Sequence, residues 1–262
     1  MARYFRLLLV RLRVSVQLGS QYRSDFLVGG VMALFWLSWN LVPMWVVWQK
    51  RPMIAGWSFP EALLVAAWFT LMRGVLEGAV QPSLVAVVEH IRQGTLDFVL
   101  LKPADAQFLV STAKFESWRA ADAIGALVIG GYALHRVAHP PAASAIAVAL
   151  LLTLAGAAVL YAVAIVVVAA AFWVVRLDNL IYLFNSIFDA ARWPLTVFRG
   201  FWRILFTFII PLGLITTYPA MALLNKLDWP TALRALGGAM LFVALARVAW
   251  TRALKHYTSA SS

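Results

Sequence analysis

Residues 142–175 contain no charged side chain, and this apolar stretch constrains the fold more than any other feature of the sequence. As an α-helix, at about 1.5 Å per residue, it would be about 50 Å long. The hydrocarbon core of a bilayer is about 30 Å thick. Such a helix must tilt, project beyond the lipid or bend, and Gly156 is the candidate position for a bend. The stretch therefore predicts a helix that crosses a membrane.

The composition agrees with a membrane protein. The chain is 63% hydrophobic and 13% charged, whereas a soluble domain is roughly half apolar and about a quarter charged. It has no cysteine, which excludes disulfides and thiolate chemistry. We attribute its net charge of +11 to loops that face the cytoplasm and anionic lipid, and we expect no nucleic-acid partner. The predicted fold class is an all-α integral membrane protein.

Five apolar segments are good candidates for membrane crossings, which need about 20 mostly apolar residues each. They cover residues 26–48, 57–80, 117–134, 142–175 and 229–250.

A sixth crossing is expected between residues 176 and 228, where two interpretations stay open. In the first, 178–195 is the fifth span, and 197–224 enters the membrane and returns to the same side as a re-entrant segment. In the second, 178–195 lies on the cytoplasmic face and 203–224 crosses. Arg192, Arg199 and Arg203 favour the second under the positive-inside rule. Both give six crossings, with both termini on one side.

Basic residues predict the orientation of the chain. They concentrate in residues 1–25, in the 81–116 loop and in the C-terminal tail, which we therefore place in the cytoplasm. Residues 1–25 also have arginines on one side of a helical wheel and apolar residues on the other. This pattern favours an amphipathic helix in the membrane interface over a cytosolic tail with helical bias.

Three of the charged residues inside the expected spans form a candidate cluster. Arg73 and Glu77 are four residues apart and can pair on one helix. Asp122, in the third span, could reach Arg73 at a similar depth. Charges in lipid cost several kcal/mol, which makes them candidate functional groups. We interpret these three as a polar clamp between helices rather than a proton relay, because a relay usually needs carboxylates near the midplane.

The 81–116 loop predicts a short amphipathic helix. Pro82 and Ser83 suit a helix start, and Gly94 suits a left-handed C-terminal position. An apolar stripe with charged edges, lying parallel to the membrane, would suit docking into a groove on a soluble partner. The alternative is a surface helix that rests on lipid. The candidate contact residues are Glu89, Arg92, Gly94, Leu96, Asp97, Lys102 and Pro103.

No catalytic motif is visible. No lysine follows a glycine, so the chain has no P-loop for ATP, and no serine lies in a Gly-x-Ser-x-Gly elbow. His135 and His139 make a weak candidate metal pair, and we expect no metal or cofactor on this chain. An integral membrane enzyme acting on lipids would need convergent catalytic residues. A secondary transporter would usually show inverted repeats and midplane ionisable residues. Neither pattern is apparent, so we expect a protein that is not an enzyme.

Two stretches are similar to a known family. "IRQGTLDFVLLKP" resembles the cytosolic loop of permease subunits of type-2 ATP-binding-cassette (ABC) transporters, and "WPLTVFRGFWRILFTFIIPLGLITTYPA" resembles their segment before the last span. The resemblance implies that residues 1–262 form a single permease domain. It also implies that 83–93 is a coupling helix seated on a separate ATPase dimer, which binds ATP and Mg. It favours the re-entrant interpretation of 197–224, on the outer face.

The resemblance also implies an assembly and a function. A second permease subunit, identical or homologous, would complete a pathway in a bacterial cytoplasmic (inner) membrane. The expected function is ATP-driven export by alternating access. The many aromatic residues, including 12 Trp, hint at an amphipathic or hydrophobic substrate.

Overall fold

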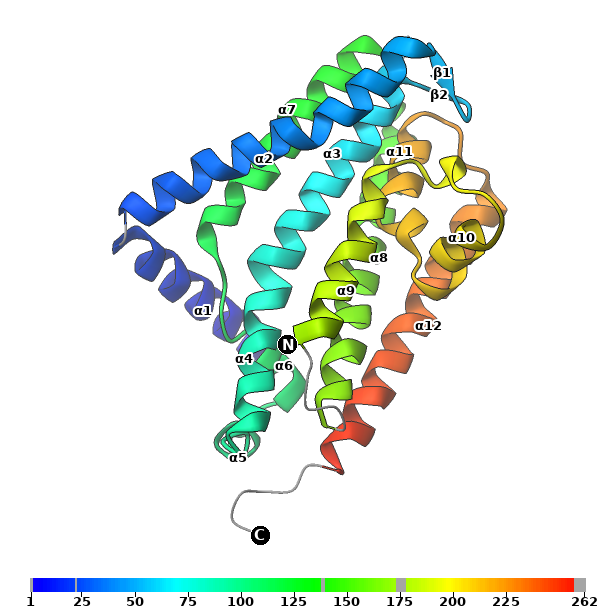
Figure 1. Cartoon of the computed structure of the whole chain (residues 1–262). Helices are drawn as coiled ribbons and strands as arrows, with labels where there is room; N and C mark the ends of the chain where they lie inside the picture. The colour runs from blue at the N-terminus through cyan, green and yellow to red at the C-terminus, as the bar shows by residue number, and fades with distance from the viewer. Residues whose placement is uncertain (1, 22, 138–139, 173–177, 257–262) are drawn as a thin grey trace.

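The computed structural model describes residues 2–21, 23–137, 140–172 and 178–256. Within them it is an α-helical bundle with one small hairpin (Figure 1). Four helices are long and apolar enough to cross a membrane, or five if a bent pair counts as one span. The predicted all-α class is therefore confirmed. The last three residues of the fourth predicted span, 173–175, lie outside the described part.

The chain begins with two helices and a tight turn. Helix α1 (Ala2–Gln21) is followed by α2 (Arg23–Lys50), which covers the first predicted span. Strands β1 (Met53–Ile54) and β2 (Trp57–Ser58) then pair antiparallel. Ala55 and Gly56 join them with φ values of 51° and 83°. Positive φ at both turn residues matches the twist that a two-residue hairpin needs.

The next helix is longer than the sequence predicts. Helix α3 (Phe59–Val75), the π-helical turn η1 (Leu76–Val80) and α4 (Gln81–Arg92) form one helix of 34 residues. The expected new helix start at Pro82 is wrong. Proline removes a backbone N–H and crowds the carbonyl four residues earlier. The π-turn before it shifts the hydrogen-bond register, with the Gln81 N–H donating to Leu76, so the helix continues.

Beyond α4 the chain turns back through α5 (Asp97–Leu100), α6 (Ala106–Ser111) and the 3₁₀ turn η2 (Ser117–Arg119). Helix α7 (Ala120–Arg136) then packs along α3 as the third predicted span. At 17 residues, α7 is shorter than the four helices that are long and apolar enough to cross a membrane, but its length is within the range that can cross lipid.

Helix α8 (Ala143–Ala169), extended by the 3₁₀ turn η3 (Ala170–Phe172), packs on the last helix, α12 (Trp229–Leu254). Helix α8 continues through Gly156 without a break. Gly156 instead lets another backbone approach closely. A Cβ placed there would lie 3.0 Å from the Ile215 Cα and from the Leu214 carbonyl oxygen.

The region between α8 and α12 is the most irregular part of the chain. It contains α9 (Asp178–Phe188), 3₁₀ turns η4 (Asp189–Arg192) and η5 (Leu195–Val197), α10 (Gly200–Ile204), π-turns η6 (Leu205–Ile209) and η7 (Gly213–Thr217), and α11 (Tyr218–Leu223). The segments 200–209 and 213–223 meet at an angle of 74°. Pro211 lies at the break, where a proline cannot continue a helix ladder.

Two sets of contacts show the path of this region along the bundle. Along α9–η4, Asn185 accepts a hydrogen bond from Gln81 (2.8 Å). Further on, Thr196 accepts one from the Trp57 indole (2.8 Å). The segment therefore runs antiparallel to the long helix, from α4 to the hairpin. After the bent pair, Lys226 returns to the hairpin, where it donates to the Gly56 carbonyl (3.1 Å).

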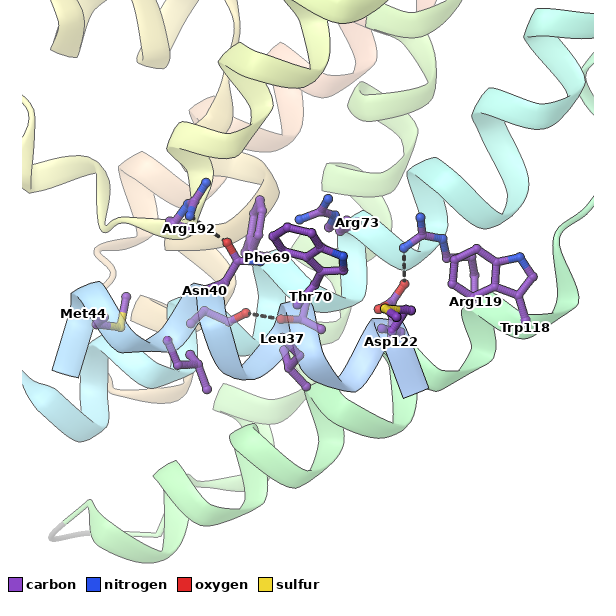
Figure 2. A pocket seen from close by; sticks show the side chains of 15 residues that line it. Leu37, Asn40, Met44, Phe69, Thr70, Arg73, Trp118, Arg119, Asp122 and Arg192 are labelled. Carbon is purple, nitrogen blue, oxygen red and sulfur yellow. Dashed lines mark hydrogen bonds and ion pairs between the residues drawn. The ribbon is translucent and has the colours of Figure 1, made fainter. Parts of the chain in front are cut away.

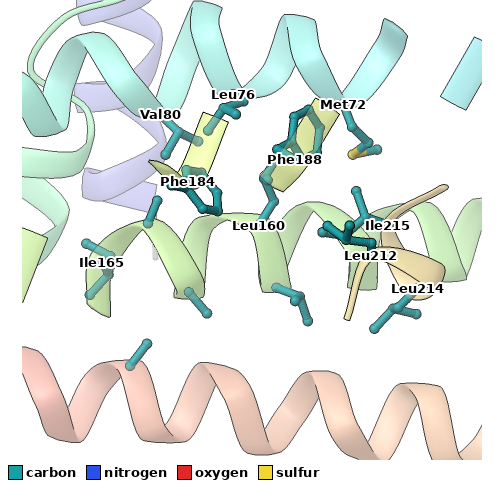
Figure 3. Packing of buried hydrophobic residues seen from close by; sticks show 14 of the residues in the cluster. Met72, Leu76, Val80, Leu160, Ile165, Phe184, Phe188, Leu212, Leu214 and Ile215 are labelled. Carbon is teal, nitrogen blue, oxygen red and sulfur yellow. The ribbon is translucent and has the colours of Figure 1, made fainter. Parts of the chain in front are cut away.

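The main apolar core joins several parts of the bundle (Figure 3). Its buried side chains include Met72 and Leu76 from the long helix, Leu160 from α8, Phe188 from α9, Ile215 from η7 and Trp250 from α12. In lipid the hydrophobic effect between helices is weak, so close packing of this kind holds a bundle together. The core fixes the long helix against α8 and α9.

Candidate functional site

The far end of the long helix carries an exposed apolar tip. Gly94 has a φ of 66°, and the Thr95 N–H donates to the His90 carbonyl (2.9 Å), which stops the helix in a left-handed turn. The short α5 follows at the extremity of the bundle (Figure 1). Leu96 is fully buried beneath it, whereas Phe98 and Leu101 are 70% and 81% exposed. Two exposed apolar side chains on an anchored turn make a surface suited to a protein partner.

The predicted contact residues lie around this tip, but the predicted apolar stripe faces elsewhere. Leu84, Val87 and Val88 pack in the protein's own core. Glu89 accepts a hydrogen bond from Gln93, and Asp97 opens α5. The remaining predicted polar residues, Arg92 and Lys102, lie on either side of α5, and the Pro103 carbonyl accepts a hydrogen bond from Arg3.

The loop behind the tip is closed on itself. Ser83 is fully buried, and its hydroxyl donates to the Lys114 carbonyl (2.7 Å) and accepts from the Lys114 N–H (3.0 Å). The Gly78 carbonyl, which Pro82 cannot bond because it lacks an N–H, accepts a hydrogen bond from the Glu116 N–H (2.8 Å). These bonds join the two ends of the 81–116 loop.

The same loop is also attached to the first and last helices. Arg247 on α12 pairs with Asp105 (2.6 Å) and donates to Gln107 (2.7 Å). From α1, Arg11 donates to the Leu109 carbonyl (2.6 Å) and to Thr112 (2.7 Å). The hydrogen bonds from Arg247 hold the pKa of the Asp105 carboxyl below its usual value. The loop that carries the tip is therefore bonded to both α1 and α12.

A second group of polar residues lies where α3 meets α7. The predicted pair is confirmed, with Arg73 Nε 2.8 Å from Glu77. Asp122 is buried against Gly74, as its expected depth requires, but its ion pair is with Arg119 (3.2 Å), not with Arg73. Arg119 also pairs with Glu77. Arg119 lies three residues before Asp122, a spacing that brings two side chains together on one helical turn, so Asp122 pairs with Arg119.

Two glycines make this meeting possible. A Cβ on Gly74 would lie 2.9 Å from the Asp122 Cβ, and one on Gly78 would lie 2.9 Å from the Arg119 Cβ. Both distances are shorter than real Cβ contacts allow. Small residues of this kind let membrane helices approach closely. The spacing Arg-Gly-x-x-Glu-Gly over residues 73–78 thus places both the charges and the room for their partners on one face.

These charges border a cavity of about 360 Å³ (Figure 2). Its polar lining includes Arg73, Arg119, Asp122 and also Arg192, which donates to Asn40 on α2 (2.8 Å). The apolar lining comes from α2, with Met32, Ala33, Trp36, Leu37, Leu41 and Met44, and from α3, with Ala66 and Phe69. Sequence reasoning missed Arg192 and Asn40, because 152 residues separate them.

Groups for covalent or metal chemistry are not assembled in the described ranges. No three histidine, aspartate or glutamate side chains there are close enough to hold a metal ion. His139, one of the pair weighed from the sequence, lies outside the described residues.

The long apolar helices and the buried charges between them define a multi-pass α-helical membrane protein. A family model, described as ABC-2 family transporter protein, matches residues 34–261. The chain belongs to this family and is an ABC-2 type permease subunit, which implies partnership with an ABC ATPase subunit. The resemblance drawn from the loop and the Pro-rich segment is thereby confirmed. Neither the curated proteins nor the solved structures gave a match.

Proposed function

We propose that this chain is the permease half of an ATP-driven exporter, and that it receives mechanical work through the α5 tip. The observation that carries the proposal is the pairing of an exposed apolar tip, Phe98 and Leu101, with a long helix that is hydrogen-bonded to its own returning loop through Ser83. A soluble ATPase dimer, which would hold ATP and Mg, covers this tip. The candidate residues Glu89, Arg92, Asp97 and Lys102 then supply the charged rim of the contact.

The long helix suits the role of a lever. At about 1.5 Å per residue it is about 50 Å long, so one end extends beyond a hydrocarbon core of about 30 Å. The bonds of Ser83 and Gly78 keep the returning loop attached to it. When ATP closes the ATPase dimer, the tip, the loop and the long helix move as one body, and a pathway between two permease subunits opens to the other side.

The proposed topology follows from the same lever. With the tip in the cytoplasm, both α1 and the end of α12 lie on the cytoplasmic side of a bacterial inner membrane, with α1 in its interface. Segment 178–195 makes the fifth of six crossings, and 197–224 re-enters from the outer face. Supporting this, Thr196 and Lys226, which flank that segment, both bond to the 53–58 hairpin.

The test replaces the apolar tip without disturbing the fold. The double variant Phe98→Asp, Leu101→Asp should keep its thermal stability in detergent, because both side chains are exposed. It should lose co-purification with a P-loop ATPase from its native membrane, since two charges would be buried unpaired in the contact. The control is Lys50→Gln, an exposed position at the end of α2 that lies outside the tip and its rim. Wild-type amounts of bound ATPase in the double variant would refute the proposal.

A further inference from the structure

The cavity between α2, α3 and α7 is lined by arginines whose protein partners differ (Figure 2). The two terminal nitrogens of Arg119 face Glu77 and Asp122. Arg73 donates its Nε to Glu77 (2.8 Å), and Arg192 donates its Nε to the Asp189 carbonyl (2.9 Å) and its Nη1 to Asn40 (2.8 Å). One further terminal nitrogen of Arg73 and one of Arg192 share the Asp189 carboxylate. Its oxygen lies 3.9 Å from the Arg73 Nη1 and 3.6 Å from the Arg192 Nη2, and both distances exceed hydrogen-bond range.

The position of this carboxylate makes it replaceable. Asp189 is 43% exposed, whereas Asp122 on the opposite side of the cluster is buried. Counting Glu77 and Asp189, the six charges of the cluster balance. The cavity lining itself, however, has three arginines and one carboxylate, and that carboxylate is paired with Arg119. An incoming oxyanion would therefore meet two guanidinium groups and compete with one exposed aspartate.

The shape of the cavity limits what this oxyanion can be attached to. Its volume of about 360 Å³ is near the lower end for ligand pockets, enough for a headgroup but not for a whole lipid. Met32 and Trp36 on α2 line it and are each about half exposed, so the cavity opens past an apolar surface. A chain attached to the headgroup would lie along α2, while the head remains inside.

We propose that this cavity binds the head of an amphipathic molecule that carries an oxyanion, such as a phosphate monoester, between Arg73 and Arg192. Arginine recognises oxyanions through two parallel hydrogen bonds, and such charge-assisted bonds are strong in a site away from water. A cationic head is disfavoured, because three guanidinium groups line the cavity. Only the interpretation of this site as one that recognises cargo rests on the proposed function. Binding is measured without the ATPase, so its result does not depend on whether the proposed function is correct.

The experiment measures binding of three probes to the full chain in a neutral detergent by calorimetry. The probes are dodecyl phosphate, inorganic phosphate and dodecyltrimethylammonium. Dodecyl phosphate should bind, and the other two should bind at least about tenfold more weakly. Equal binding of inorganic phosphate would overturn the amphipathic class, and equal binding of the ammonium probe would overturn the oxyanion site.

Two variants should change the affinity for dodecyl phosphate in opposite directions. Arg192→Gln should weaken it about tenfold or more, the usual effect of losing one charge-assisted hydrogen bond. Asp189→Asn should strengthen it several-fold, because the competing carboxylate is gone. A purely structural cluster would lose affinity in both. Arg234→Gln is the matched control, since Arg234 bonds within the first turn of α12 and does not line the cavity, and it should change nothing.

Two further measurements identify the source of the oxyanion. If the molecule is a resident lipid, the purified wild type retains anionic phospholipid that Arg192→Gln has lost, as seen by mass spectrometry. If it is cargo, dodecyl phosphate stimulates ATP hydrolysis by the co-purified complex of permease and ATPase.

The variants also define the result that would refute the site. Affinities for dodecyl phosphate that fall together in Arg192→Gln and Asp189→Asn, or that fall equally in Arg234→Gln, would do so.

Discussion

Asp105 has two structural roles at one position. Its carboxylate caps α6 by accepting the Phe108 N–H (3.0 Å), and it pairs with Arg247 on α12. The first role shapes the loop, and the second attaches the loop to the last helix. Asparagine caps helices about as well as aspartate, so the substitution Asp105→Asn separates the two roles.

The difference in stability between wild type and this variant depends on pH. The reason is the lowered pKa of Asp105 in the wild type, whose main cause is hydrogen bonding from Arg247. An ionised carboxylate with a depressed pKa stabilises the folded state above its unfolded pKa of about 3.9. This stabilisation is lost as the pH falls through the folded value. Wild type should exceed Asp105→Asn by a few tenths to about 1 kcal/mol at pH 7, given the partial exposure of the pair.

The measurement is thermal unfolding in detergent at several pH values. The difference between wild type and Asp105→Asn should be constant above about pH 5 and shrink below about pH 4. A difference that grows on acidification would contradict the ion pair as the cause.

Other residues of the two sites show what a sequence can and cannot predict. The Arg73–Glu77 pair follows from spacing on one helix, and so it was predictable. Arg192, Asn40 and Asp189 join the cluster only because η4 lies beside α3 and α2. Nothing in their local sequence shows that neighbourhood. The exposed pair Phe98 and Leu101 lies within the motif that carried the resemblance. From the sequence alone, however, apolar residues in a short helix are equally consistent with buried positions in the core.

At the level of elements, the long helix shows how a proline can attach a loop instead of ending a helix. Pro82 and Ser83 read as a helix start, which is their usual meaning. In the structure Pro82 leaves the Gly78 carbonyl to Glu116, and Ser83 takes both backbone groups of Lys114. The π-turn that makes this possible depends on tertiary contacts and has no sequence signal of its own.

Ser83→Ala tests this attachment. It leaves the Lys114 N–H and carbonyl without their partner in a partly buried site, which costs about 1–3 kcal/mol. Hydrogen exchange should become at least about tenfold faster at the amides of Lys114 and Glu116, with little change in α3. Ser38→Ala is the control, because Ser38 bonds only within its own helix at an exposed position. Unchanged exchange at Lys114 would show that the attachment is unimportant.

At the scale of the whole molecule, the helical class, four of the predicted spans and the family were predictable, because long apolar stretches and a loop motif encode them directly. The path of 176–228 was not. The arginines argue for a crossing by 203–224 and the family likeness for a re-entrant segment 197–224. The contacts of Thr196 and Lys226 with the hairpin are the basis on which we propose the re-entrant path. Those contacts span 139 and 170 residues, which no local pattern reports.

The proposed topology can be tested with single cysteines, since the chain has none of its own. Arg199→Cys and Pro230→Cys lie in exposed positions on either side of the bent pair. Both should react with a membrane-impermeant thiol reagent from outside the cell, and Lys102→Cys should react only after the membrane is opened. Reaction of Arg199→Cys and Pro230→Cys from opposite sides would mean that the segment between them crosses.

The central claim is that the α5 tip contacts an ATP-hydrolysing subunit, and crosslinking from Phe98 tests it most directly. A photoreactive amino acid in place of Phe98, activated in native membranes, should give a crosslinked product that contains a P-loop ATPase, identified by mass spectrometry. The same group at Tyr132, exposed near the opposite end of the bundle, should not give that product. Crosslinks from Phe98 only to lipid or to other parts of this chain would contradict the account.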